Sequence, residues 1–480
     1  RLGLGAFVGV DYPEPNLSYS LDPSADGSYA GLDRFGRVVD HTWKNAGTGE
    51  EAVHIGHGYD RSGNRLYRED VVARAHGVDM DEFYEYDGLN QLVDMQRGAL
   101  DVEKSAIAAP NFGEGWDLDA TGNWAGYNRD TDGDGAFDFQ QDRVHNKANE
   151  LVSLDGTGGD VWVSPTHDRA GNMARVPKAG DPSTQLALQY DAWNRLVGIS
   201  EATVLLVAYE YDGRNYRVTG STWNSEGVWE DRAFFYNNQW QCLAARMHGG
   251  SQAERHFVWG LRYLDDLILR DRDVPVAGDA SAVERLYSLQ DANWNRVATI
   301  ERTGSMVERY GYTPFGRVSF LTSAYAERSA SGRHVEVLFA GRFLEPEVGI
   351  YDNRRRIYSP MLGRFLQRDD IFGLSAYRYA EGSPILFTDP SGRVTTQTVV
   401  LTTLGVIRTL ISLAELIASL KTDPLHLRHG SDSPWYTFSD GRTNVNNAME
   451  LSARSLPAEA RPPNSYTFVL EVAARDPDFF

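Results

Sequence analysis

The chain has 480 residues, enough for two or three domains, and a formal net charge of −20. This acidic balance argues against a nucleic-acid-binding surface over the whole chain, because phosphate contacts require clustered Lys and Arg side chains. Cys242 is the only cysteine of the sequence, so an intrachain disulfide is excluded. A single cysteine is most often an inert, small core residue.

The first 27 residues contain Pro13, Pro15 and Pro23, separated by polar residues. This composition predicts an entering segment (1–27) ahead of the main fold. Because the sequence begins with Arg1, we interpret the chain as part of a longer polypeptide. The absence of a signal peptide therefore excludes no cellular location.

A repeat fills residues 28–333. Its template is an aromatic residue, an Asp, two variable residues, Gly or Asn, a polar residue and an apolar one. Examples are GLDRFGRVVD at 31, GYDRSGNRLY at 58 and QYDAWNRLVG at 189. The template aspartates at 33, 60 and 87 are 27 residues apart, and those at 168, 191 and 212 are 23 and 21 apart. Self-similarity at such a period predicts stacked supersecondary units.

Each repeat has the pattern of a β-hairpin. The Asp side chain opens a turn by binding backbone N–H groups, and the Gly or Asn accepts a positive φ. Alternating apolar residues flank the turn, as in Leu196 to Ile199 after one turn and Val204 to Tyr209 before the next. One hairpin cannot bury its apolar face alone, so the pattern predicts a continuous, mostly antiparallel β array.

Helical periodicity is scarce in this sequence. Residues 71–86 form a candidate short helix, and 397–421 is the strongest candidate, with apolar residues spaced by three and four. The second segment is long enough to cross a bilayer, but Arg408 and Glu415 lie in its middle. We interpret it as a buried or interfacial helix, and a transmembrane or pore-forming segment is the alternative.

Residues 334–393 differ from the repeats in their density of Tyr, Arg, Gly and Pro. Strand-like runs alternate there with Pro-containing turns. Six short motifs follow one another: Arg356-Ile-Tyr358-Ser-Pro360, Gly363-Arg-Phe365, Arg368-Asp369, Tyr377-Arg-Tyr379, Ser383-Pro384 and Asp389-Pro-Ser-Gly392. In this order they resemble the core segment of the RHS (rearrangement-hotspot) or YD-repeat family. In that family the core follows the repeats and precedes a variable C-terminal domain.

The resemblance covers roughly residues 28–393 and implies a mainly β fold. A spiralling antiparallel array of YD repeats would form part of a hollow shell, followed by a short mixed or helical tail. The implied domains are the entering segment, the repeat array (28–333), the core (334–393) and a variable C-terminal domain (394–480).

The implied function is a bacterial shell protein, secreted or at the cell surface, that encloses or presents its own C-terminal segment as cargo. Its expected partners are that cargo, an upstream part of the same polypeptide, and a cell-surface target or secretion apparatus. The alternative is a cell-surface or secreted adhesion or recognition protein that uses the β array as a scaffold without catalysis.

Two aspartates held close together cannot both ionise easily, so one keeps a proton while the other activates water, as in aspartic proteases. The resemblance assigns such a pair to Asp369 and Asp389, with Arg368 assisting a single self-cleavage near Arg393. The first element departs from the family pattern, because it lacks its Pro and its Gly373 comes one place late. Arg393 also replaces the usual Leu. The alternative is that these residues only form turns that close the shell.

The segment NRDTDGDGAFDFQQD at 128–142 carries alternating carboxylates before a Gly, the order of a calcium-binding loop. Its candidate ligands are Asp130, Asp132, Asp134 and Asp138. Gln141 stands where an EF-hand has its bidentate Glu, and no helical pattern flanks the loop. The sequence predicts a calcium-stabilised loop between repeats, with a solvated acidic turn as the alternative. No other cofactor is expected.

The tail from 394 to 480 has its densest polar cluster at HLRHGSDSPW, which includes His426 and His429. A zinc deaminase is excluded, because the tail has no cysteine and no HxE motif paired with PCxxC. Two histidines three residues apart in a Pro-flanked loop are typically surface residues. The sequence therefore assigns no activity to this tail.

Overall fold

The structure, a computed structural model, describes residues 7–22, 27–158, 161–223, 228–250, 252–274, 282–369 and 376–393, and the backbone of 396–397. All of them belong to one unit, formed by Arg1–Asp369 and Leu374–Arg408. The predicted helix at 397–421 and the predicted C-terminal domain at 394–480 lie outside the described residues, except for the backbone of 396–397.

Two long antiparallel sheets contain most of the described residues, and their strands pair in sequence order. The first sheet has 11 described strands: β1 (Gly9–Tyr12), β2 (Leu17–Ser20), β3 (Asp40–Asn45), β4 (Glu51–Tyr59), β5 (Arg65–Asp70), β6 (Asp81–Tyr86), β7 (Leu92–Leu100), β8 (Ile107–Leu118), β9 (Trp124–Asp130), β10 (Phe139–His145) and β11 (Leu151–Thr157). The predicted antiparallel array is confirmed over this part of the chain.

The second sheet continues the same order through 15 described strands: β12 (Thr166–His167), β13 (Met173–Lys178), β14 (Asp181–Tyr190), β15 (Leu196–Glu201), β16 (Val204–Tyr211), β17 (Arg217–Trp223), β18 (Trp229–Tyr236), β19 (Cys242–Met247), β20 (Arg255–Trp259), β21 (Leu267–Asp273), β22 (Val283–Gln290), β23 (Arg296–Glu301), β24 (Met306–Tyr312), β25 (Val318–Thr322) and β26 (Glu327–Arg328). The mainly β fold class is therefore confirmed in the degenerate repeats as well.

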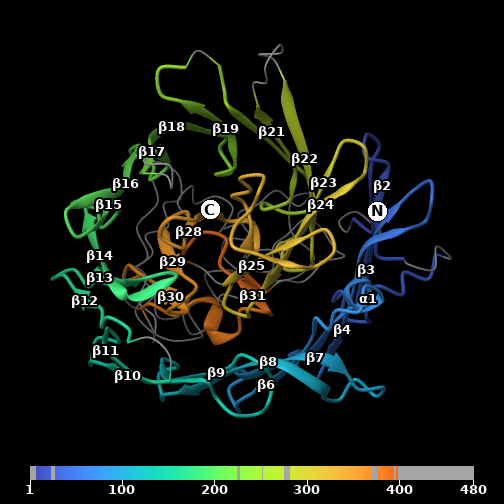
Figure 1. Ribbon diagram of the computed structural model, residues 1–480, viewed down its shortest axis with the longest axis horizontal. Coiled ribbons are helices and arrows are strands. Elements are labelled where there is room, and N and C mark those ends of the chain that lie inside the picture. The colour runs from blue at the N-terminus through green and yellow to red at the C-terminus, as the bar shows by residue number, and fades with distance from the viewer. Residues whose placement is uncertain are drawn as a thin grey trace, which may run out of the picture. The chain divides into compact units, whose positions relative to one another are not determined.

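The core segment forms a separate four-stranded antiparallel sheet of β27 (Phe343–Glu345), β28 (Ile350–Asn353), β29 (Arg356–Ser359) and β30 (Arg364–Phe365). Farther along, β31 (Phe387–Thr388) pairs with β32 (Thr396–Gln397). The helical elements of the described residues are α1 (Val71–Ala75), η1 (Phe339–Gly341) and η2 (Ala380–Gly382). Within this unit, strands of both long sheets lie around the small sheet (Figure 1).

The repeat template forms its turns as the sequence indicates. In the turn after β14, Oδ1 of Asp191 accepts from the backbone N–H of Trp193 at 2.9 Å and of Arg195 at 3.0 Å. Asn194 adopts a φ of 61°, a left-handed conformation that Asn tolerates better than most residues. The aspartates of these turns are therefore structural, as predicted.

The aromatic residue of the template has a role that the hairpin argument did not assign. Its hydroxyl donates to a backbone carbonyl of an earlier strand: Tyr190 to Met173 at 2.9 Å, and Tyr211 to Leu196 at 2.8 Å. A buried phenol needs such a partner, because an unpaired hydroxyl is costly to desolvate. The Tyr and Asp of these two repeats thus connect neighbouring hairpins as well as forming them.

The candidate helix at 71–86 is mostly wrong. The helix α1 begins after Asp70, whose side chain accepts from the N–H of Ala73 at 3.0 Å. It ends before Gly77, which has a φ of 73° that interrupts the helical backbone. Residues 81–86 instead form strand β6, because pairing with β5 and β7 outweighs their weak local preference.

Aromatic side chains of the core segment pack at the centre of the unit. Tyr351, Tyr358, Phe365 and Tyr379 are each at most 2% exposed. Burying an aromatic side chain of this kind contributes about 3 kcal/mol of transfer free energy. The hydroxyl of Tyr358 donates to the carbonyl of Phe315 at 2.7 Å, which connects the small sheet to the turn between β24 and β25. The core is thus held by contacts from distant parts of the chain.

Candidate functional site

The turn Asp389-Pro-Ser-Gly392 forms the first part of the candidate site. Oδ1 of Asp389 accepts from the backbone N–H of Gly392 at 2.9 Å and of Arg393 at 3.0 Å. Gly392 has a φ of 75°, and a Cβ there would lie 2.4 Å from the carbonyl oxygen of Asn353. Only glycine fits this position without displacing β28. The turn is therefore pressed against the small sheet.

Arg356, from β29, joins the two predicted catalytic carboxylates. Its Nη2 lies 2.8 Å from Oδ2 of Asp369 and 3.3 Å from Oδ2 of Asp389. Its guanidinium also lies over the ring of Phe365, at 3.7 Å from the ring centre. Both carboxylate side chains are largely buried, at 13% and 2% exposed, so their charges require compensation. The structure brings the two predicted aspartates together around one guanidinium.

The peptide bond between Gly392 and Arg393 is bound at both of its polar atoms. Nε of Arg356 donates to the carbonyl oxygen of Gly392, and the N–H of Arg393 donates to Asp389. A cationic donor on a carbonyl oxygen stabilises the negative charge that develops there during acyl transfer. A carboxyl group beside the amide nitrogen is suitably placed to exchange a proton with it. The arrangement has the parts that peptide hydrolysis needs.

Arg368, predicted to assist, lies elsewhere. It is exposed, its stem lies beside Gly171, and among the described residues no ion pair joins it to Asp369 or Asp389. Arg356 occupies the position expected of it. The sequence motif contained Arg356, and a useful signal was present: an Arg in a strand of buried residues needs a partner for its charge, and a carboxylate is a natural candidate.

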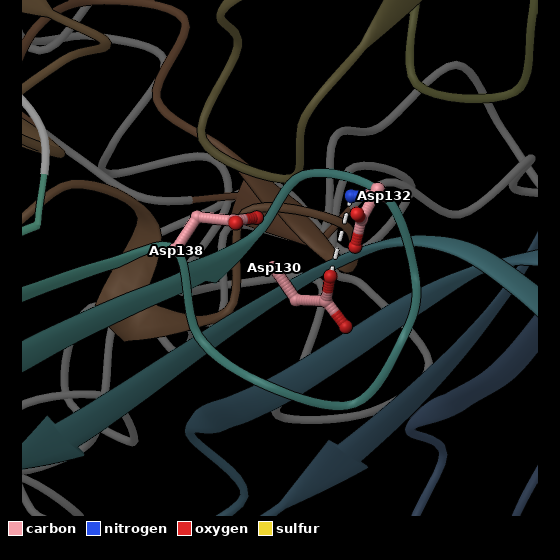
Figure 2. A group of neighbouring side chains, drawn as sticks. All are labelled: Asp130, Asp132 and Asp138. Carbon is pink, nitrogen blue, oxygen red and sulfur yellow. Dashed lines mark hydrogen bonds between the residues drawn. The ribbon is translucent and has the colours of Figure 1, made fainter.

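The predicted calcium loop connects β9 and β10 and lies apart from this turn in the sequence. Carboxylate oxygens of Asp130, Asp132 and Asp138 lie within 4.8 Å of one another, whereas Asp134 is outside this group (Figure 2). Asp130 is buried and accepts from the N–H of Gly133 at 2.7 Å. Asp138 accepts from the hydroxyl and N–H of Thr131, which lower the pKa of its carboxyl group.

These bonds show that the loop can close by itself. Three carboxylates supply part of the six to eight oxygen ligands that Ca²⁺ takes, and backbone N–H groups already use several of their lone pairs. Calcium binding therefore stays a prediction, and the carboxylates that lie together are those of Asp130, Asp132 and Asp138.

Across the described ranges, no helix is both long and apolar enough to cross a membrane. The candidate segment 397–421 lies almost wholly beyond those ranges, so its interpretation stays open.

The geometry defines a shell of repeated β-hairpins around a core that carries an Arg-bridged pair of aspartates. Comparison with solved structures finds the same fold. A crystal structure of TcdB2-TccC3-Cdc42 matches with a TM-score of 0.58 and 16% identity, over 79% of this chain and 18% of that one. A Tc holotoxin pore of Photorhabdus luminescens matches with a TM-score of 0.59 and 14% identity, over 83% of this chain and 19% of that one.

Two curated proteins match by sequence. Toxin protein Tse5 of Pseudomonas aeruginosa is 25% identical over 365 residues, which are 67% of this chain and 27% of that protein. Salivary gland surface protein 1 of Aedes aegypti is 32% identical over 105 residues, which are 22% of this chain and 3% of that protein. No family model matches the chain. The likenesses to the Tc toxin structures show a common fold, and the match to Tse5 agrees with the RHS/YD-repeat resemblance that the motifs indicate. The chain spans at most 27% of the length of these proteins.

Proposed function

We propose that the chain is the C-terminal part of a secreted or surface-associated RHS shell protein that carries residues 394–480 as cargo. In this proposal the shell cuts its covalent link to the cargo once, at the turn 389–393, and then holds the cargo by packing. The shell fold and the likeness to toxin proteins support cargo delivery as the general role.

One observation carries the self-cleavage proposal. Arg356 contacts Asp369, Asp389 and the carbonyl oxygen of Gly392 at the same time. A turn that had only to close the shell would be complete with the bonds from Asp389 to its own backbone. The three further contacts of the Arg356 guanidinium hold its positive charge against the carbonyl oxygen of the Gly392–Arg393 peptide bond.

The proposed reaction is a hydrolysis. Asp369 accepts a proton from water as the water oxygen attacks the carbonyl carbon of Gly392. Arg356 stabilises the negative charge on the carbonyl oxygen, and Asp389 carries a proton to the nitrogen of Arg393 as the C–N bond breaks. One proton must be shared between the two aspartates, so cleavage slows at pH values where both are ionised.

Intact mass spectrometry of the purified chain tests the proposal after an overnight incubation. Cleavage before Arg393 releases a fragment of 88 residues (480 minus 392), and cleavage after it releases 87 (480 minus 393). Asp369→Asn and Asp389→Asn should each give an uncut chain that still folds, at a lower melting temperature because a buried ion pair with Arg356 is lost. Asp191→Asn, which alters a repeat turn of similar hydrogen bonding, is the matched control and should still be cut.

An intact wild-type chain would refute self-cleavage. The core would then serve as structure alone, and the recognition scaffold would become the better hypothesis. Cleavage of either Asp→Asn variant at the wild-type rate would instead refute the roles assigned to the two carboxylates.

A further inference from the structure

Asp265 lies just before β21, remote in sequence from the core, and is 1% exposed. Its carboxylate accepts two parallel bonds from Arg342, at 3.0 and 2.9 Å. It also accepts from Nη2 of Arg354 at 2.6 Å. One buried carboxylate therefore fixes two guanidinium groups, and the bidentate geometry defines the orientation of Arg342.

The same two arginines bind the turn of the candidate site. Nη2 of Arg342 donates to the carbonyl oxygen of Pro390 at 3.1 Å, and Nη1 of Arg354 donates to the same oxygen. Pro390 lies between Asp389 and Gly392, so these bonds hold a different carbonyl of the turn from the one that Arg356 binds. Charge-assisted hydrogen bonds thus connect Asp265 to the carbonyl of Pro390, two residues before Gly392.

The backbone around Asp265 shows that its position is closely defined. Gly341 has a φ of 68°, and a Cβ on it would lie 2.7 Å from Cβ of Asp265. The side-chain amide of Gln290 donates to the carbonyl oxygen of Asp265 at 2.9 Å. The connection from β20 to β21 therefore packs directly on the core through contacts that tolerate little movement.

Asp265 also compensates charge. Burial lowers the pKa of Arg354, the neighbouring charge of Arg342 lowers it further, and Asp265 raises it. Without this carboxylate, the two buried guanidinium groups would lose the ion-pair partner that they share. At least one of them would turn away, and the carbonyl of Pro390 would lose a donor.

We infer that Asp265 is a positioning residue for self-cleavage, acting through Arg342 and Arg354 on the turn 389–393. The inference rests on the proposed function. It predicts that loss of this carboxylate changes where the turn lies and therefore which bond is cut, in addition to slowing the cut.

The matched control is the adjacent Asp266, which is 2% exposed and forms an ion pair with Arg262 at 2.5 Å. Among the described residues, Arg262 makes no hydrogen bond or ion pair with the turn, so Asp266→Asn removes an equally buried ion pair without touching the site. We expect Asp265→Asn to slow cleavage about 100-fold, as for a misplacement of about 1 Å, and to spread the cut over neighbouring bonds. Asp266→Asn should lower the melting temperature to a similar degree and leave the cleaved bond unchanged.

Hydrogen exchange gives a readout that does not require cleavage. The N–H groups of Gly392 and Arg393 donate to Asp389 in the positioned turn. We expect the peptide containing them to exchange at least about tenfold faster in Asp265→Asn than in Asp266→Asn, the effect of losing one charge-assisted hydrogen bond. Measuring both variants on the Asp369→Asn background keeps the chain intact.

The outcomes separate the two claims. A wild-type chain that stays intact refutes self-cleavage, while the exchange experiment still decides whether Asp265 positions the turn. Equal exchange in the two variants, or an Asp265→Asn chain cut at the wild-type bond and rate, overturns the inference.

Discussion

Glu336 connects the first residues of the core segment to the second long sheet, and its replacement by Gln is a sharp test of the electrostatic argument. Oε1 lies 2.8 Å from Arg255, and Oε2 lies 3.3 Å from Arg270. These two arginine side chains are 10% and 1% exposed. The substitution keeps the shape of the side chain and removes one of the two carboxylates that each arginine contacts.

The expected cost can be worked out in two ways. Removing one partner of a buried ion pair typically costs about 3–5 kcal/mol. The nearby Arg255 and Arg270 outweigh burial and lower the pKa of Glu336 from 4.5 to about 2, and 1.36 kcal/mol per unit makes this about 3 kcal/mol. The two values agree, so we expect Glu336→Gln to lower the free energy of unfolding by about 3 kcal/mol at pH 7.

The pH dependence follows from the direction of the shift. The carboxyl group of Glu336 binds a proton more weakly in the folded chain than in the unfolded chain. Its stabilisation is therefore complete above pH 4.5 and is lost as the pH falls toward 2. Urea unfolding at several pH values should show this loss in the wild type and a flatter profile in Glu336→Gln.

Glu201→Gln is the control, because Glu201 forms a more exposed ion pair with Lys178. A surface pair of this kind contributes less than about 1 kcal/mol. If Glu336→Gln cost no more than this control, the argument from buried charge would fail.

Two further predictions follow from the described residues. Burial lowers the pKa of His41 to about 3, so below pH 6.5 the unfolded chain binds a proton that the folded chain does not. In this range the free energy of unfolding should fall by about 1.4 kcal/mol for each unit by which the pH is lowered. Urea unfolding of His41→Phe should lack this contribution to the pH dependence. For the acidic loop we expect a modest Ca²⁺-dependent rise in melting temperature that Asp132→Ala removes and Asp134→Ala largely keeps, because Asp134 lies outside the carboxylate group. Calorimetry without heat of binding at millimolar Ca²⁺, or equal effects of the two variants, would contradict this.

Local rules made the repeat array predictable. An Asp followed by Gly or Asn codes for its turn within a few residues, as the bonds from Asp191 to Trp193 and Arg195 show. The two aspartates of the candidate site were assigned by the family resemblance of the core motifs. The helix expected at 71–86 failed where pairing with neighbouring strands overrode the local pattern. Asp134 was expected beside the other loop carboxylates, but it is not in the group that the structure forms. Spacing along the sequence alone does not fix where a loop side chain points.

The contacts of Arg356 and Asp265 belong to another class, because nothing near them in the sequence specifies their partners. Arg356 meets Asp389 over 33 residues, and Asp265 meets Arg342 over 77. Such pairs are fixed by the packing of whole elements, which a single sequence does not reveal. A buried Arg or Asp could be suspected from its apolar surroundings, but its partner could not be named.

This long-range assembly has a consequence for the proposed reaction. The turn 389–393 gains its contacts to Arg342, Arg354 and Arg356 only once the small sheet has formed. The first two arginines gain Asp265 only when the β20–β21 connection packs on the core. A chain with an incomplete second sheet would hold the carbonyls of Pro390 and Gly392 loosely and cut slowly or at mixed positions. In the proposed function, cleavage at a single bond therefore requires a completed shell, so the cargo would lose its covalent link only after the shell has folded.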